Sequence, residues 1–236
     1  MRPAPELKRF CVITGHYGCG KTNLAVNLAL DLAEEHGAVS LVDLDVVNPY
    51  FRSSDYTALL ESAGVRVIAP TFAGTTLDVP SLSSAVYSVF SGDGIVLVDA
   101  GGDDVGATAL GRFARDIGEI DYDMLYVINR YRNLTTTPAE AAALLGEIEA
   151  ASHLKATGVV NNSHLRDETT LATVLDSLAY GRETAALVGL PLRFTTVPAA
   201  LAADFAATPG HAESGESAYP VTIHVRTPWE ETPQEG

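Results

Sequence analysis

The chain has 236 residues, of which 47% are hydrophobic and 19% are charged, and its formal net charge is −15 at pH 7. A chain of this length can bury a sizeable core as one domain, and its hydrophobic content excludes a disordered protein. The acidity disfavours nonspecific binding to nucleic acid or to anionic membranes.

The cysteines and the N-terminal residues indicate in which cellular compartment the protein is expected. The chain has only two cysteines, Cys11 and Cys19, without C-x-x-C spacing, which disfavours both a disulfide framework and a structural zinc site. The segment Met1–Lys8 lacks the apolar stretch of a signal peptide, and no run approaches the roughly 18 apolar residues of a membrane span. We therefore expect a cytoplasmic protein that binds neither nucleic acid nor membrane.

The first elements are a strand, a glycine-rich loop and a helix. The apolar run Phe10–Ile13 indicates a buried strand, and leucines recur at every fourth residue within the expected helix Lys21–His36. Between them, Gly15–Thr22 reads G-H-Y-G-C-G-K-T and matches G-x-x-x-x-G-K-S/T, the phosphate-binding P-loop. In this arrangement the backbone N–H groups of the loop and the positive end of the helix dipole point into one hollow, which suits a phosphate chain. Lys21 would add a positive charge there, and the Thr22 hydroxyl would bind Mg²⁺. The flanking elements disfavour the alternative, an ordinary glycine turn.

Strand and helix patterns alternate through the rest of the chain. We expect further strands at Val39–Asp43, Val65–Ile68, Ile95–Val98, Met124–Ile128, Val159–Val160 and Leu192–Val197. We expect helices after Ser54 and at Ser81–Phe90, Gly106–Asp116, Thr137–Ala151 and Thr169–Val188, and a loop at Phe72–Val79.

This alternation predicts an α/β fold, a doubly wound and mostly parallel sheet flanked by helices. Residues 9–206 would form the P-loop nucleotide-binding domain. Residues 207–236 would add an edge strand at Tyr219–Val225 and end in a disordered acidic tail.

Carboxylates follow two of the expected strands. The strand at Val39–Asp43 leads into Asp45, and the strand at Ile95–Val98 leads into Asp99-Ala100-Gly101-Gly102. Ligands of such sheets bind at the carboxyl ends of the strands, and Mg²⁺ prefers oxygen ligands. Asp99 is thus the Walker B candidate, and Asp43 or Asp45 would orient the attacking water or the metal shell. The alternative is that these acids only cap turns.

These stretches carry a resemblance. V-D-L-D at Val42–Asp45 and L-V-D-A-G-G at Leu97–Gly102 resemble the switch I segment and the Walker B and switch II segments of the MinD/Mrp/ParA and nitrogenase-iron-protein class of P-loop ATPases, the SIMIBI class. Gly158–Asn162 is similar to the strand that ends in the adenine-recognising asparagine of that class, which falls at Asn162. The resemblance extends over Arg9–Ala203. It implies a parallel sheet, Mg²⁺-ATP and a nucleotide-dependent homodimer, and the absence of an N-K-x-D motif favours ATP over GTP.

The loop and the resemblance together define the predicted site. The expected catalytic residues are Lys21, Asp45 and Asp99. The expected metal ligands are Thr22, Asp45 and Asp99. The expected nucleotide-binding residues are Gly15, His16, Tyr17, Gly18, Cys19, Gly20, Lys21, Thr22, Asn23, Gly102 and Asn162.

One position departs from the family pattern. The class carries a signature lysine early in the loop, where this chain has His16. In the family that lysine reaches the phosphates bound by the partner subunit, whereas a histidine is shorter and mostly neutral at pH 7. His16 would donate a hydrogen bond to phosphate, become charged next to the triphosphate, or simply fill a loop position.

Two further runs allow two interpretations each. Asn48–Arg52 places two aromatic residues and an arginine after an Asn-Pro turn, for partner docking or for packing. Asn129–Arg132 follows the expected fifth strand, and Arg130 or Arg132 would contact phosphate or line an acidic surface.

The leading functional hypothesis is an ATPase that acts as a nucleotide-dependent switch. ATP and Mg²⁺ would order Asp43–Arg52 and Asp99–Gly106, and hydrolysis would release them to a protein partner. Among the partners that the resemblance suggests, we favour a metalloenzyme or oxidoreductase that needs an accessory or maturation factor. The alternatives are an ATP-dependent ligase or transferase of the dethiobiotin-synthetase or cobyrinate-amidation type, and an ATP-binding regulator with little turnover.

Overall fold

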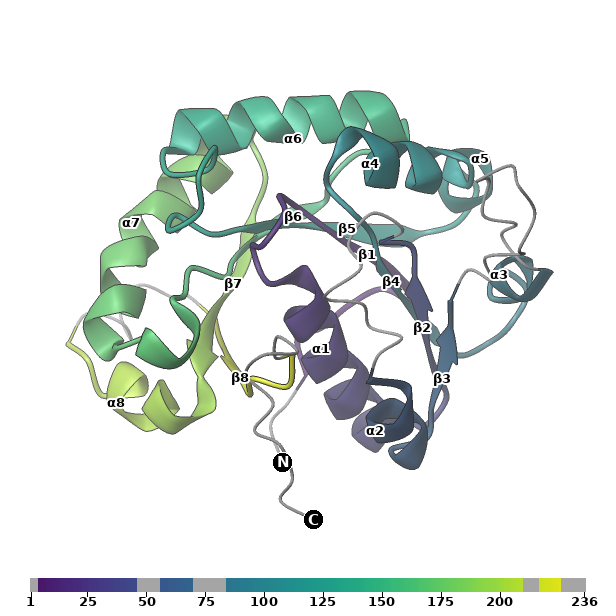
Figure 1. The fold of residues 1–236 in the computed structure, drawn as a ribbon, viewed down its shortest axis with the longest axis horizontal. Coiled ribbons are helices and arrows are strands. Elements are labelled where there is room, and N and C mark those ends of the chain that lie inside the picture. Colours follow the sequence, from purple (N-terminus) through teal and green to yellow (C-terminus); the bar gives the residue numbers. More distant parts are fainter. Residues whose placement is uncertain (1–3, 46–55, 70–83, 210–216, 226–236) are drawn as a thin grey trace, which may run out of the picture.

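Eight parallel strands form one sheet in the order β3-β2-β4-β1-β5-β6-β7-β8 (Figure 1). The computed structural model describes residues 4–45, 56–69, 84–209 and 217–225. The Asn48–Arg52 run, the expected loop at Phe72–Val79 and the end of the tail lie outside these residues. The expected α/β architecture is confirmed.

The strands and helices follow the predicted order closely. The strands are β1 Phe10–Thr14, β2 Val39–Asp43, β3 Val65–Ile68, β4 Ile95–Asp99, β5 Tyr122–Ile128, β6 Gly158–Asn161, β7 Leu192–Pro198 and β8 Ala218–Val221. The helices are α1 Lys21–His36, α2 Thr57–Ser62, α3 Ser84–Ser88, α4 Asp104–Gly111, α5 Ala114–Gly118, α6 Pro138–Ser152, α7 Leu171–Val188 and α8 Ala202–Ala206, with 3₁₀ turns η2 Arg166–Glu168 and η3 Ala199–Leu201.

The central strands carry apolar side chains on both faces because helices cover both faces. Phe10 and Val12 of β1 belong to one core, which α3, α4, α5, α6 and α7 cover. Cys11 and Ile13 belong to the opposite core, where α1 and α2 pack. Figure 1 shows α4, α5 and α6 on one side of the sheet and α1 and α2 on the other. The carboxyl ends of the strands remain accessible at one edge.

The expected single helix Gly106–Asp116 is wrong, because the chain forms α4 and α5 with a break at Phe113. Phe113 is 1% exposed and leaves helical geometry, with φ −103° and ψ 3°, so that its ring is buried and lies tilted against the rings of Tyr87 and Phe90. At the preceding turn, a side chain on Gly111 would press on the Ala151 carbonyl of α6 at 2.9 Å. Burial of the ring and this close crossing set the break.

The C-terminal segment packs onto the domain. Tyr219 and Val225 are 2% and 7% exposed and join the core on the α1 face. Tyr219 of β8 sits edge-on to Phe194 of β7, with ring centroids 5.5 Å apart. The structure has a strand here, but it covers Ala218–Val221 and ends four residues before the expected Val225, because residues 222–225 bind the side chains of Asn23 and Asn27 on α1 instead.

Candidate functional site

The P-loop joins β1 to α1 and adopts backbone conformations that favour glycine. Gly18 and Gly20 have φ values of +74° and +89°. Lys21 opens α1, is 5% exposed, and donates from Nζ to the carbonyl of His16 at 3.2 Å. The N–H of Cys19 donates to the same carbonyl at 3.2 Å. The ammonium group is therefore held across the loop, where a phosphate chain would meet it.

The segment after β4 lies directly on the P-loop. A Cβ placed on Gly102 would overlap the backbone carbonyl of Gly15, so only glycine allows this approach. One residue later, Asp103 caps α4 by accepting the N–H of Gly106 at 2.7 Å. A change in the loop would therefore be transmitted to the start of α4.

Three carboxylates converge beside the loop. Asp43, Asp45 and Asp99 are 2%, 6% and 0% exposed. Within the described part of the chain, neither carboxylate oxygen of Asp99 has a hydrogen-bond partner. Burial, followed by the negative charge of Asp43, raises the pKa of Asp99 to about 8; Asp45 acts in the same direction, and Lys21 and Thr22 act in the opposite one. A buried carboxylate without donors is an unfavourable arrangement that a cation would relieve.

This arrangement fits hydrated Mg²⁺ better than a fully protein-bound metal. No group of three or more His, Cys, Asp or Glu side chains in the described ranges is arranged to hold a metal ion by itself. Mg²⁺ typically binds one or two carboxylates, keeps several waters and uses phosphate oxygens. The Thr22 hydroxyl, Asp45 and Asp99 could supply the protein part of such a shell.

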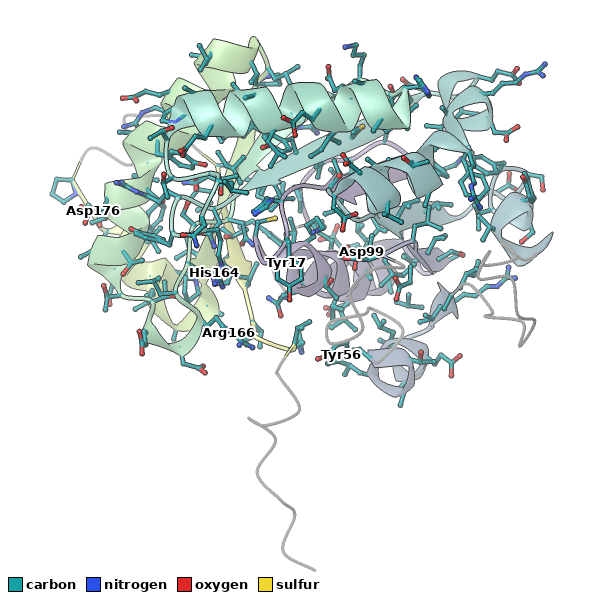
Figure 2. The ribbon with its side chains drawn as sticks, turned by 45° about the horizontal axis from the view of Figure 1, so that its top comes forward. Tyr17, Tyr56, Asp99, His164, Arg166 and Asp176 are labelled. Carbon is teal, nitrogen blue, oxygen red and sulfur yellow. The ribbon has the colours of Figure 1, made fainter. Side chains whose placement is uncertain are left out.

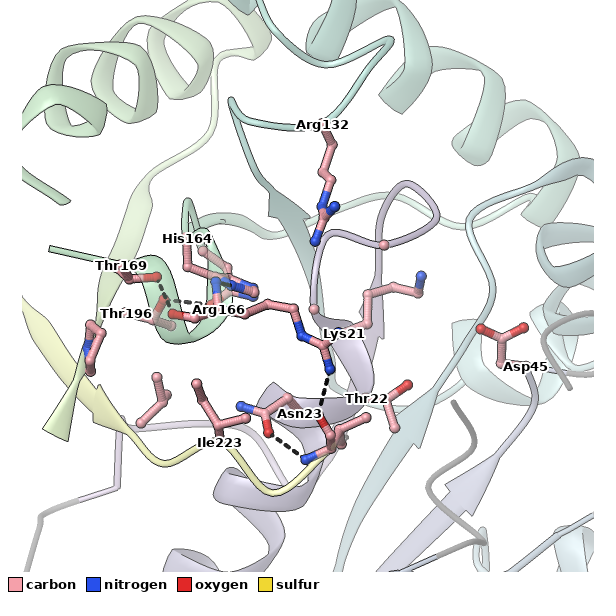
Figure 3. Close-up of a pocket in the computed structure, with 16 residues that line it drawn as sticks. Lys21, Thr22, Asn23, Asp45, Arg132, His164, Arg166, Thr169, Thr196 and Ile223 are labelled. Atoms are coloured by element: carbon pink, nitrogen blue, oxygen red, sulfur yellow. Dashed lines mark hydrogen bonds between the residues drawn. The ribbon is translucent and has the colours of Figure 1, made fainter. Parts of the chain in front are cut away.

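A pocket extends from the P-loop between β7, β8 and the segment that follows β6 (Figure 3). Asp45 lies at one end of this pocket, and His164, Arg166 and Thr169 lie at the other, with Lys21 between them. Its lining residues are Gly18, Gly20, Lys21, Thr22, Asn23, Asp45, Arg132, Asn162, His164, Arg166, Thr169, Thr196, Pro198, Val221, Ile223 and Val225.

Seven of the predicted site residues line this pocket: Gly18, Gly20, Lys21, Thr22, Asn23, Asp45 and Asn162. Gly15, His16, Tyr17, Cys19, Asp99 and Gly102 lie outside its lining. Asp99 is buried next to the lining. The exposed Tyr17 lies between His164 and Asp99 in the view of Figure 2.

Asn162 ties the end of β6 to the P-loop. Its Nδ2 donates to the carbonyl of Cys19 at 2.7 Å, and its Oδ1 accepts from the Thr196 hydroxyl at 2.5 Å. Gly20 is required beneath it, because a Cβ there would collide with the Asn162 amide. Both ends of the amide are engaged, so adenine recognition by Asn162 stays a prediction in which the base would replace or share these bonds.

The basic end of the pocket was not predicted. His164 lies two residues after Asn162, and its Nδ1 accepts the N–H of Arg166 at 3.1 Å. Burial and the charges of Arg132 and Arg166 lower the pKa of His164 to about 4, so its ring is neutral at pH 7. The strand that ends in Asn162 predicted that residue, but no sequence motif placed His164 and Arg166 near the P-loop.

The wall of the pocket opposite β6 comes from the C-terminal segment. Val221, Ile223 and Val225 line it, and Arg166 Nη2 donates to the Val225 carbonyl at 3.2 Å. Asn23 does not reach toward the loop hollow. Its Nδ2 donates to the Thr222 carbonyl at 3.0 Å, which fixes this wall to α1.

The sequence left two questions open: whether His16 is charged, and whether Arg130 or Arg132 faces the phosphates. Burial, followed by the charge of Lys21, lowers the pKa of His16, which favours the neutral ring at pH 7. Arg132 lines the pocket, whereas Arg130 Nη1 donates to the carbonyl of Asp176 on α7.

No protein-family model matches the sequence, and no curated protein matches it. Solved structures do match the fold. Cell division protein FtsY from Thermotoga maritima is 20% identical over 84% of this chain and 64% of its own, with a TM-score of 0.52. The signal recognition particle receptor FtsY from Elizabethkingia anophelis in complex with GDP is 17% identical over 81% of this chain and 58% of its own, with a TM-score of 0.53.

The 54 kDa protein of the signal recognition particle from Aeropyrum pernix in complex with GDP is 16% identical over 81% of this chain and 42% of its own, with a TM-score of 0.51. The chain thus spans less than two thirds of each of these neighbours. The likeness confirms the expected α/β fold, a parallel sheet flanked by helices. The narrower MinD/ParA resemblance stays a prediction.

Among the described helices, none combines the length and the hydropathy that a bilayer span requires.

Proposed function

We propose that this chain binds a nucleoside triphosphate with Mg²⁺ in the P-loop pocket, hydrolyses it, and acts as a nucleotide-dependent switch. The observation that carries the proposal is the buried carboxylate of Asp99. It lies close to Lys21 and Thr22 of the loop, and neither of its oxygens has a hydrogen-bond partner among the described residues. Such a site is unfavourable when empty and becomes favourable once a cation and phosphates arrive.

Each predicted residue has a distinct role in this proposal. The loop N–H groups and Lys21 hold the phosphates, and Thr22 with Asp45 and Asp99 holds Mg²⁺ directly or through water. When bound, Mg²⁺ neutralises charge that develops on the phosphates. Asp45, which lines the pocket, orients the attacking water.

We propose ATP as the nucleotide. The base would occupy the end of the pocket that Asn162, Thr196 and the C-terminal segment line. Of the described lining residues only Asp45 is acidic, and it lies at the opposite end (Figure 3). An amide both donates and accepts, as the adenine edge requires, whereas a carboxylate would suit the donor edge of guanine. The two neighbours that contain GDP make guanine nucleotides the alternative to test.

The switch would act through Gly102 and α4. Because Gly102 rests on the Gly15 backbone, phosphate in the loop would bias the segment that begins α4. We further propose that the triphosphate form is a homodimer, with the exposed Tyr17 and Val105 covered by the second copy. An accessory role toward a metalloenzyme or oxidoreductase is the partner class that the resemblance suggests.

The test is to measure binding and phosphate release for the purified chain with Mg²⁺-ATP and with Mg²⁺-GTP. We expect tighter ATP binding, basal phosphate release, and loss of binding in Lys21→Ala but not in Lys155→Ala, a change at an exposed lysine of the loop before β6. Unchanged ATP affinity in Lys21→Ala would overturn the assignment. Release only after a carboxylate metabolite is added would favour the ligase, and tight binding without release would favour the regulator.

A size measurement of the chain with and without a non-hydrolysed ATP analogue tests the homodimer. A shift to twice the monomer mass on binding supports it, and an unchanged mass contradicts it.

A further inference from the structure

The loop supplies little positive charge of its own. A nucleoside triphosphate carries several negative charges, and Lys21 is the one lysine or arginine within Gly15–Thr22. His16 stands where the resembling class has a lysine, and burial beside Lys21 lowers the pKa of its imidazole. The neutral ring leaves the outer part of the loop without a second cation.

Arg132 lies over the loop at this point. A Cβ placed on Gly18 would lie 3.6 Å from its Nε, 3.8 Å from its Cδ and 3.9 Å from its Cζ. The guanidinium group therefore rests against the loop backbone, and Arg132 lines the pocket that contains Lys21 (Figure 3). Gly18 has φ +74°, so its backbone conformation favours glycine beneath the arginine, and the space beside it is filled by the Arg132 side chain at ordinary contact distance.

A well-held turn positions Arg132 after β5. The N–H of Arg132 donates to the carbonyl of Asn129 at 3.2 Å, and the N–H of Thr135 donates to the carbonyl of Arg132 at 3.2 Å. Asn129 is fully buried, and its Nδ2 donates to the carbonyl of His164 at 3.2 Å. The backbone of Arg132 is thus fixed from both sides, which limits the freedom that its side chain must lose on binding.

The side chain of Arg132 has unused donor capacity. Its Nε is buried and has no hydrogen-bond partner among the described residues. An unpaired buried donor costs about 1–3 kcal/mol, so the arrangement favours an incoming acceptor. A guanidinium group presents five donors in a planar fork that matches phosphate oxygens.

Arg130, two residues earlier, serves a different purpose. Its Nη1 donates to the carbonyl of Asp176 on α7, and its guanidinium group lies 5.6 Å from the centre of the Tyr131 ring. Tyr131 in turn donates its hydroxyl to the carbonyl of Thr173 at 2.7 Å. Arg130 therefore faces α7, and it provides a matched control for Arg132.

We infer that Arg132 contacts the phosphate chain of the bound nucleotide from within the same chain, and that it supplies the second cation in place of a lysine at position 16. This inference rests on the proposed function. A guanidinium group supplied by the same chain also stabilises the charge of phosphoryl transfer in other P-loop NTPases. The geometry makes Arg132 a residue for both phosphate affinity and turnover.

The test uses Arg132→Gln, Arg132→Lys and Arg130→Gln, with three measurements on each. These are the affinity for inorganic tripolyphosphate, the affinity for Mg²⁺-ATP and the rate of phosphate release. We expect Arg132→Gln to weaken tripolyphosphate binding at least about tenfold and to slow release at least about 100-fold. Arg132→Lys should recover part of both, and Arg130→Gln should stay within about twofold of the unchanged chain.

The outcomes separate the inference from the proposed function. If the unchanged chain binds and hydrolyses nucleotide but Arg132→Gln matches Arg130→Gln, the inference is wrong and the function stands. If the unchanged chain binds neither probe, both are wrong. Melting temperatures of the ligand-free variants identify a folding defect, and a loss in Arg132→Gln that Arg132→Lys partly restores without any change in melting supports a phosphate contact.

Discussion

Asn27 and Thr222 exchange two hydrogen bonds, although 195 residues separate them. Asn27 Nδ2 donates to the Thr222 carbonyl at 2.8 Å, and the N–H of Thr222 donates to Asn27 Oδ1 at 2.8 Å. One turn earlier, Asn23 Oδ1 accepts the N–H groups of His224 and Val225 at 2.8 and 3.1 Å. Two asparagines at i and i+4 thereby hold the C-terminal segment along the helix that begins at the phosphate loop.

The first prediction concerns this attachment. Asn27 is 3% exposed, and Asn27→Ala removes both of its hydrogen bonds to Thr222, which leaves the Thr222 N–H without this acceptor and the Thr222 carbonyl with only the donor from Asn23. We expect the free energy of unfolding to fall by about 2 kcal/mol. Nucleotide affinity should also fall, because Ile223 and Val225 of the released segment line the pocket. Chemical denaturation and a binding titration measure the two effects.

The control for this prediction is Glu34→Ala on the exposed side of α1. Surface changes of this kind usually alter stability by less than about 0.5 kcal/mol. If Asn27→Ala and Glu34→Ala have equal effects on both measurements, the segment does not support the pocket.

Local patterns predicted most of the fold. The helix Lys21–His36 and the strands Val39–Asp43 and Val65–Ile68 agree with the structure to the residue, because the apolar pattern marks all three segments and Gly37 ends the helix. The attachment of 222–225 to α1 could not be predicted in this way. Nothing in the sequence marks Asn23 and Asn27 as binding residues, because the segment that they bind lies nearly 200 residues away.

The second prediction tests the contact between the P-loop and the segment after β4. Gly102→Ala would place a methyl group on the backbone carbonyl of Gly15, so the two segments must separate. We expect a loss of about 1–3 kcal/mol in stability and a clear loss of nucleotide affinity. Thermal melting with and without Mg²⁺-ATP measures both.

Gly146→Ala provides the matched control. Gly146 lies in the exposed interior of α6, and a Cβ there meets nothing within 4 Å. Alanine should therefore stabilise the helix by about 0.5–1 kcal/mol and leave binding unchanged. Normal nucleotide affinity in Gly102→Ala would show that the close approach does not matter for the loop.

The third prediction concerns Asp45, which lines the pocket and is 6% exposed. Asp45→Asn keeps the size of the side chain but removes its charge and its capacity to accept a proton. We expect phosphate release to slow about 100-fold or more, with ATP affinity within about threefold. Single-turnover hydrolysis and a binding titration separate the two. An equal loss of both would make Asp45 a structural residue.

The site was harder to predict than the fold. Lys21, Thr22, Asp45 and Asn162 line one pocket, as parallel strand ends near a P-loop imply. The sequence could not choose between Arg130 and Arg132, since the turn after β5 decides which one faces the loop. Interactions between side chains and a distant backbone have no periodicity in the sequence.

The last prediction follows from Asp99, whose pKa is raised from an ordinary 3.8 to about 8 by burial beside Asp43 and Asp45. The unfolded chain loses this proton near pH 4, whereas the ligand-free folded chain keeps it up to about pH 8. Between these values the folded state binds more protons, so stability from this group falls as pH rises. The loss amounts to at most about 1.4 kcal/mol per pH unit.

Asp99→Asn removes this titration and should therefore melt at the same temperature as the unchanged chain near pH 4. It should melt progressively higher as pH approaches 8, by roughly 2–4 °C for each kcal/mol. Asp93→Asn makes the same replacement on the exposed turn before β4, and its difference should not grow with pH. With saturating Mg²⁺-ATP at pH 8 the unchanged chain should melt at a higher temperature than Asp99→Asn. Only the unchanged chain then gains the metal contact that the Asp99 carboxylate provides. If the difference in melting temperature does not change from pH 4 to 8, Asp99 is already ionised in the ligand-free protein. The buried carboxylate would then not be a group that Mg²⁺ binding stabilises, and the proposed metal site would be wrong.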